Sequence, residues 1–358
     1  MKAVINLLIL VSVVMTNQTQ AIETIESANI SDTETTIIGV NQIGLSVKNL
    51  DDALDFYQRA TGFELISRKR FSNSVAADTL FAHKAVEVEV ATLKAPNMLF
   101  ELMAFSHNEQ APERRMPAFG PGMTHTCFQS PLDQSGWDKF IKAGAEPLTR
   151  GGQPIDLGGY GVTYGYAYDP EGNMMELEQL DADMLRKAKY DNTWKDIGHS
   201  MWMSQVALVS HDIERLMQFY QKVLGISPYR TAELVDNVKA GLIADIDDLH
   251  LLGGWFRMNE RSKVIELWQY LNPLTAEFSG ERRATDLGYS FALEVEDIQA
   301  EYQRMVALGV DFVSAPTKLD GSWQAYARDI DGNIFSIRQF IDVNSPYSVR
   351  VLDKTIEQ

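Results

Sequence analysis

The chain carries the same segment twice. Residues 42–57 recur as residues 205–220, and every matching position is offset by 163 residues. Each copy holds a short apolar run, a capping residue (Asn49 in the first copy, Asp212 in the second) and an amphipathic segment that ends at a glycine. This pattern predicts a strand followed by a helix in each copy, so one supersecondary unit is expected to occur at least twice.

Two further segments extend the repeat. Residues 124–144 correspond to residues 288–309, and each predicts another strand and helix ending at glycine. Both are followed by a Gly-Asn turn between strand-forming residues, in residues 169–177 and 329–337. Gly-Asn is typical of a hairpin that needs a positive φ angle. The chain is therefore expected to contain four consecutive units, each with one strand, one helix and three strands (βαβββ).

The remaining strands of units one and three are expected where apolar and polar residues alternate. They are residues 63–71, 85–93, 98–105, 238–244, 250–256 and 263–271. The irregular residues 72–83 are a candidate lid or pocket loop.

Length and charge limit the classes of protein. A chain of 358 residues is long enough for two ordinary domains, and a net charge of −17 repels phosphate backbones. We therefore expect a small-molecule substrate, no nucleic-acid partner, no membrane contact once a signal is cleaved, and a monomer or homodimer. The expected segments are a signal peptide (1–21), a flexible lead-in (22–38), a first domain (39–180), a linker (181–203), a second domain (204–342) and a C-terminal tail (343–358).

The N-terminus has the pattern of an export signal. Lys2 precedes an apolar run at residues 3–15, a polar stretch follows, and Thr19-Gln-Ala21 resembles a cleavage site. The apolar run is shorter than the roughly 20 residues that span a membrane, which favours cleavage. A periplasmic or secreted protein is expected. Cys127 is the only cysteine, so no internal disulfide can form.

Each unit has two positions that can face a common cavity, one early in its first strand and one in its last strand. In chain order these positions hold Gln42 and Glu101, His125 and Glu176, Gln205 and Glu266, and Tyr289 and Ser336. A single histidine or glutamate on a strand is usually structural. Glu101 and Glu176, however, stand in apolar runs where an unpaired carboxylate is costly to bury.

The paired units, the Asp169-Pro-Glu-Gly-Asn hairpin and the order Gln, Glu, His, Glu resemble the vicinal oxygen chelate superfamily, and the quartet is similar to that of glyoxalase I. The resemblance implies an α+β fold in which paired βαβββ modules form two incomplete mixed β-barrels with flanking helices. It also implies one divalent metal ion (Zn, Ni, Mn or Fe) and a catalytic base at Glu176, aided by the other carboxylate of the quartet, Glu101.

The sequence leaves the pairing of the units open. If units one and two form a barrel, the metal ligands are Gln42, Glu101, His125 and Glu176. If the units exchange partners, the ligands are His125, Glu176, Gln205 and Glu266. Either arrangement leaves one complete site and one degenerate site with Tyr289 and Ser336. Neighbouring units are favoured, because sequential elements pack together more often than distant ones.

The resemblance indicates an exported, glyoxalase-like metalloenzyme of the lyase or isomerase type, acting on a small oxygen-chelating substrate. Glutathione is not the expected substrate, since Ser46 and Phe105 stand where that family has an arginine and an asparagine that help to bind it. The alternatives are a binding protein that sequesters a small molecule and a non-heme iron dioxygenase.

Overall fold

The structure is a computed structural model, and it describes residues 34–107, 115–189, 198–258, 264–278 and 280–355. The expected signal peptide and the lead-in up to residue 33 lie outside these residues. Within the described part of the chain, no helix is both long and apolar enough to cross a membrane.

The four expected units are present. Units one and two comprise β1 (Ile37–Ser46), α1 (Leu50–Thr61), β2 (Glu64–Phe71), α2 (Val75–Leu80), β3 (Val88–Lys94), β4 (Leu99–Phe105), β5 (Gly122–Pro131), a short 3-10 turn (Leu132–Gln134), α3 (Gly136–Ala143), β6 (Glu146–Pro147), β7 (Ile155–Asp156), β8 (Val162–Tyr168) and β9 (Met174–Leu180). Helix α4 (Ala182–Ala188) then begins the connection to unit three.

Units three and four repeat this plan. They comprise β10 (Trp202–Val209), α5 (Ile213–Leu224), β11 (Arg230–Val235), α6 (Val238–Ala244), β12 (His250–Arg257), β13 (Val264–Asn272), β14 (Gly288–Val295), α7 (Ile298–Ala307), β15 (Asp311–Phe312), β16 (Thr317–Leu319), β17 (Ser322–Arg328) and β18 (Ile334–Phe340). Helix α8 (Val349–Thr355) lies in the expected C-terminal tail.

The caps and stops of the two matching helices are as predicted. Asn49 accepts hydrogen bonds from the first turn of α1, and Asp212 does the same for α5. Gly62 and Gly225 follow these helices with φ angles of 73° and 69°. An L-residue adopts such angles only with strain, so glycine is the residue that ends a helix this way.

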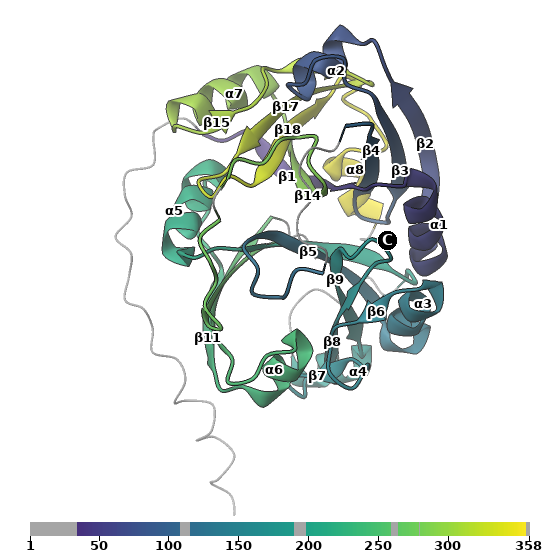
Figure 1. Ribbon diagram of the computed structural model, residues 1–358, viewed down its shortest axis with the longest axis vertical. Coiled ribbons are helices and arrows are strands. Elements are labelled where there is room, and N and C mark those ends of the chain that lie inside the picture. The colour runs from purple at the N-terminus through teal and green to yellow at the C-terminus, as the bar shows by residue number, and fades with distance from the viewer. Residues whose placement is uncertain (1–33, 108–114, 190–197, 259–263, 279, 356–358) are drawn as a thin grey trace, which may run out of the picture. The chain divides into compact units, whose positions relative to one another are not determined.

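The strands form two mixed sheets, which confirms the predicted α+β class. One sheet has the order β15-β17-β18-β14-β1-β4-β3-β2, and the other has the order β11-β12-β13-β10-β5-β9-β8-β6. The first therefore combines units one and four, and the second combines units two and three. In Figure 1 the two ends of the colour scale meet in the first sheet. The expectation that unit one shares a barrel with unit two, and unit three with unit four, is wrong.

Sequential units still contact each other through their helices and hairpins. The hydroxyl of Tyr57 on α1 donates to Asp169 in the hairpin of unit two, and Tyr220 on α5 donates to Asp329 in the hairpin of unit four. Both tyrosines are fully buried. Units one and two therefore share a tyrosine–aspartate contact, and so do units three and four. Each sheet, in contrast, combines one unit from each of these pairs.

One predicted strand is a helix. Residues 238–244 form α6, because Asn237 caps its first turn and Ala240, Ile243 and Ala244 give buried positions at helical spacing. The strand of unit three lies earlier, at β11. The candidate pocket loop at residues 72–83 also contains a helix, α2, whose first turn is capped by Ser74.

Candidate metal centre

Four neighbouring strands each supply one side chain to a single cluster. Strands β13, β10, β5 and β9 lie side by side and carry Glu266, Gln205, His125 and Glu176. All four residues are at least 91% buried. These are the residues of the exchanged pairing.

A local irregularity in β5 positions the histidine. His125 pairs with Ala207, whereas Leu208 pairs with Met123, so Thr124 is an extra residue in β5. Such a bulge changes the direction of nearby side chains. The hydroxyl of Thr124 lies 2.9 Å from Nδ1 of His125 and fixes one side of the ring.

The other imidazole nitrogen faces the two carboxylates. His125 Nε2 lies 3.7 Å from Oε2 of Glu176 and 3.8 Å from Oε2 of Glu266. It is buried and has no hydrogen-bond partner among the described residues. Burial lowers the pKa of His125 to about 4, although the nearby Glu266 acts in the opposite direction. The ring is therefore neutral at pH 7 and offers a lone pair.

The amide of Gln205 joins the two carboxylates. Its Nε2 donates to Oε2 of Glu176 and, at 3.2 Å, to Oε2 of Glu266. The other oxygen of Glu266 accepts from Nε1 of Trp255, which lies opposite Glu266 in the pairing of β12 with β13. Burial raises the pKa of Glu176 to about 7, and burial together with the charge of Glu176 raises the pKa of Glu266 to about 7.

These pKa shifts predict how the metal-free protein responds to pH. Folding raises the pKa of Glu266 from 4.5 to about 7, so the folded state favours the protonated carboxyl group. Its contribution to stability is fully present below pH 4.5 and is lost as the pH rises through about 7. In chelator at pH 8, Glu266→Gln should therefore raise the free energy of unfolding by up to about 3 kcal/mol, since one pKa unit corresponds to about 1.4 kcal/mol.

Urea denaturation between pH 4.5 and pH 8 measures this difference. The gain from Glu266→Gln should shrink toward zero at the acid end. The control is a glutamine at the exposed Glu64, which removes one charge without changing the cluster. An equal gain at both ends of the pH range would contradict the burial of an ionisable Glu266.

The donor set suits a divalent ion. One oxygen or nitrogen from each of His125, Glu176 and Glu266 lies within 4.8 Å of the others. Imidazole nitrogen with carboxylate and amide oxygen is a set that Zn²⁺, Ni²⁺, Mn²⁺ and Fe²⁺ accept. The unpartnered Nε2 faces the carboxylates, so the residues fit the metal that the resemblance implies. Cys127 and Glu178 form a second such group with Glu176.

Three residues of the cluster, Glu176, Gln205 and Glu266, line a cavity of about 510 Å³. Aromatic side chains from β8, β12 and β13 line much of it, among them Tyr166, Trp255 and Tyr270. Glu178 also lines it, and its carboxylate accepts from Gln129. The volume is typical of pockets for small molecules.

The first sheet holds a different arrangement at the matching positions. Gln42 donates to Glu101 at 2.5 Å, and Arg338 on β18 contacts both, with its NH2 group 3.0 Å from Oε1 of Glu101. The expected quartet of Gln42, Glu101, His125 and Glu176 is therefore wrong, because its two halves lie in different sheets. The guanidinium of Arg338 occupies the position between amide and carboxylate that a cation would take.

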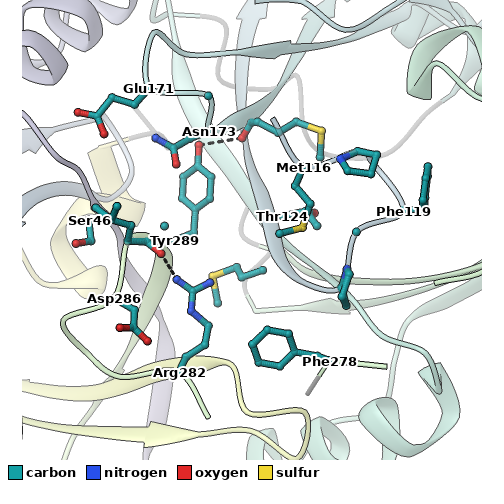
Figure 2. Close-up of a pocket in the computed structure, with 18 of the residues that line it drawn as sticks. Ser46, Met116, Phe119, Thr124, Glu171, Asn173, Phe278, Arg282, Asp286 and Tyr289 are labelled. Carbon is teal, nitrogen blue, oxygen red and sulfur yellow. Dashed lines mark hydrogen bonds between the residues drawn. The ribbon is translucent and has the colours of Figure 1, made fainter. Parts of the chain in front are cut away.

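Tyr289 does not correspond to His125. In the first sheet Gly44 pairs with Ser290, just as Ala207 pairs with His125 in the second, so Ser290 is the matching residue. Tyr289 instead lines another cavity, of about 500 Å³, and its hydroxyl donates to the carbonyl of Met174 (Figure 2). Thr124 also lines this cavity, whereas the carboxylates of the cluster do not.

Two residues of these arrangements were missed in the sequence: Thr124 and Arg338. Thr124 is adjacent to His125, but only the bulge makes it a partner of the ring. Arg338 follows Ser336 by two residues, so alternation along a strand would have placed it on the same face. The hydrogen bond from Trp255 to Glu266 is recognisable only once β12 is paired with β13.

Comparisons with known proteins agree with this architecture. Two family models match the chain, at residues 39–177 and 204–326, and both describe the Glyoxalase/Bleomycin resistance protein/Dioxygenase superfamily. Comparison with curated proteins finds no match.

Solved structures share the fold at low identity. Glyoxalase I from Zea mays has 18% identity and a TM-score of 0.55, with 89% of this chain and 95% of that chain covered. A putative dioxygenase from Bacillus subtilis subsp. subtilis str. 168 has 14% identity and a TM-score of 0.55, with 91% of this chain and 92% of that chain covered. The duplicated units, the two mixed sheets and both family matches show that the chain belongs to the glyoxalase, bleomycin resistance protein and dioxygenase superfamily.

Proposed function

We propose that the protein is a metal-dependent enzyme of the lyase or isomerase type, which moves a proton on a small substrate that chelates the metal through oxygen. The observation that supports this most is Nε2 of His125, which is buried and unpartnered among the described residues and faces two buried carboxylates in the wall of a cavity. His125, Glu176, Gln205 and Glu266 would hold the ion.

The bound ion would polarise a substrate carbonyl and make an adjacent C–H bond more acidic. Glu176 is the proposed base. Glu266 is the second carboxylate that aids it, in place of Glu101. Their carboxylates share the amide of Gln205, and Trp255 orients Glu266 by its hydrogen bond. Aromatic side chains in the cavity wall limit the access of water to the carboxylates.

Glutathione is not the proposed substrate. In the exchanged site the metal-binding glutamine is Gln205, and the residue four positions later is Val209, which is buried and uncharged. An arginine four residues after the glutamine is therefore missing from the proposed site as well as from the position of Ser46.

Proton transfer can be tested without knowing the natural substrate. Metal-loaded protein in D₂O is incubated with α-hydroxyketones and with hemithioacetals of 2-oxoaldehydes, and exchange of the carbon-bound proton is followed by NMR. Exchange is expected with at least one of these compounds. Glu176→Gln should reduce its rate by roughly 10² to 10⁴, the usual contribution of a general base.

The matched control is Glu101→Gln, which changes the equivalent carboxylate of the other sheet and should leave the exchange rate unchanged. Metal content is measured for every variant, so that loss of the ion is not mistaken for loss of the base. Protein that binds the ion but exchanges no proton would favour a sequestering protein. Oxygen consumption with catechols would favour a dioxygenase.

We also propose that the protein is exported and that its signal is removed after Ala21, on the basis of the charged, apolar and small-residue pattern of residues 1–21. N-terminal sequencing of the protein from cells that express the full chain should then begin at Ile22. A sequence that begins at Met1 would contradict export by cleavage.

A further inference from the structure

Two arginines line the cavity beside the metal cluster. Arg230 on β11 and Arg257 on β12 both contribute to its wall. The guanidinium carbon of Arg230 lies 3.8 Å from the centre of the Trp255 ring, and that of Arg257 lies 4.3 Å from the centre of the Tyr229 ring. Stacking uses the flat face of a guanidinium, whereas carboxylate recognition uses its N–H edge, so one side chain can do both.

The strand that carries Arg257 sets its separation from the cluster. Trp255 lies opposite Glu266 and donates to it. Arg257 is two residues further along the same face of β12, which corresponds to roughly 7 Å of strand. A rigid molecule that chelates the ion beside Glu266 would thus reach the arginines about one aromatic ring away.

Aromatic and aliphatic side chains together give the cavity apolar walls. Tyr160, Tyr164, Tyr166, Trp268 and Tyr270 all line the same cavity. Flat rings pack best against another flat, apolar surface. The cavity therefore suits a planar body better than a flexible polar chain.

Charge also distinguishes the two ends. The carboxylates of Glu176 and Glu266 would neutralise a bound divalent ion, so the cluster itself leaves little net charge. The β11 and β12 wall carries the two guanidinium groups. Glu178 on β9 also lines the cavity, and its carboxylate accepts from Gln129.

We propose that the substrate is a planar, aromatic or conjugated molecule that chelates the metal with oxygen at one end and carries a carboxylate at the other, which Arg257 and Arg230 bind. This assignment rests on the proposed metal site and narrows its substrate class. It names two residues that determine specificity, neither of which is a metal ligand.

Hydroxamates test the assignment, because their two oxygens chelate divalent ions and their tails can be varied. The compounds are 4-carboxybenzohydroxamate, its neutral 4-carbamoyl analogue, unsubstituted benzohydroxamate and acetohydroxamate. Affinity for the Zn²⁺-loaded protein is measured by calorimetry. The carboxylate compound should bind at least about tenfold more tightly than the carbamoyl compound, and benzohydroxamate more tightly than acetohydroxamate.

Variants assign the preference to these side chains. Arg257→Ala and Arg230→Ala should each reduce the ratio of the two affinities, and together they should bring it close to one. Arg257→Lys should keep part of the preference because it keeps the charge. Arg70→Ala removes an exposed charge from the other sheet and should leave the ratio unchanged. Benzohydroxamate affinity reports whether each variant still forms the pocket.

The outcomes separate this inference from the proposed function. If benzohydroxamate binds but the carboxylate gives no gain, or the gain survives both alanine substitutions, the anionic substrate class is wrong and the metal site stands. If Zn²⁺ does not bind, or no hydroxamate binds the loaded protein, the proposed function itself fails.

Discussion

Alanine at His125 is expected to reduce the affinity for Zn²⁺ by more than about 100-fold. Loss of a group that only hydrogen-bonds to a metal ligand already lowers metal affinity about 10- to 100-fold. His125 would be a metal ligand itself. Its Nε2 faces both carboxylates, at 3.7 and 3.8 Å, and has no hydrogen-bond partner among the described residues. Competition with a fluorescent chelator measures the affinity, and elemental analysis should give one ion per wild-type chain.

The matched pair for this experiment is the two repeated glutamines. Gln205→Ala should weaken Zn²⁺ binding, because its amide lies between Glu176 and Glu266. Gln42→Ala makes the same change at the equivalent position of the other sheet and should leave the affinity unchanged. Weaker binding in Gln42→Ala with normal binding in Gln205→Ala would contradict the site.

Alanine at Arg338 is expected to lower the free energy of unfolding by about 3 to 5 kcal/mol, the usual cost of breaking a buried ion pair. The side chains of Arg338 and Glu101 are only 8% and 12% exposed. Without the guanidinium, the carboxylate of Glu101 would be buried with Gln42 as its remaining partner. Urea denaturation gives the free energy directly.

Two further variants identify the cause. Glu101→Gln added to Arg338→Ala should recover much of the lost stability, since no unpaired charge then remains. Arg59→Ala removes an exposed arginine paired with Asp55 and should cost less than about 1 kcal/mol. A loss for Arg338→Ala no larger than that of Arg59→Ala would show that the buried pair contributes little.

The elements of the fold could be predicted because their signals are local. Asn49 and Asp212 cap their helices through their own side chains, and Gly62 and Gly225 end them through their own backbone angles. Residues 238–244 were misassigned because seven mostly apolar residues fit both periods, and the cap at Asn237 distinguishes helix from strand.

The pairing of the sheets could not be predicted, because it is not a local property. Strand β1 pairs with β14 and strand β10 with β5, and the repeated units present similar edges to either partner. Residues within one unit, such as His125 and Glu176, were therefore grouped correctly, whereas Gln42 and Glu101 were joined to the wrong sheet. Arg338 is the residue in the sequence that bears on the pairing. Its positive charge can pair with the buried Glu101 and contact Gln42 only if units one and four share a sheet.

The position of the bound ion is the most direct test. Crystals of the protein grown with Zn²⁺ should show one strong anomalous peak per chain, about 2.0 to 2.2 Å from Nε2 of His125 and from oxygens of Glu176, Gln205 and Glu266. A peak beside Gln42 and Glu101, or none at His125 in fully loaded protein, would contradict the account.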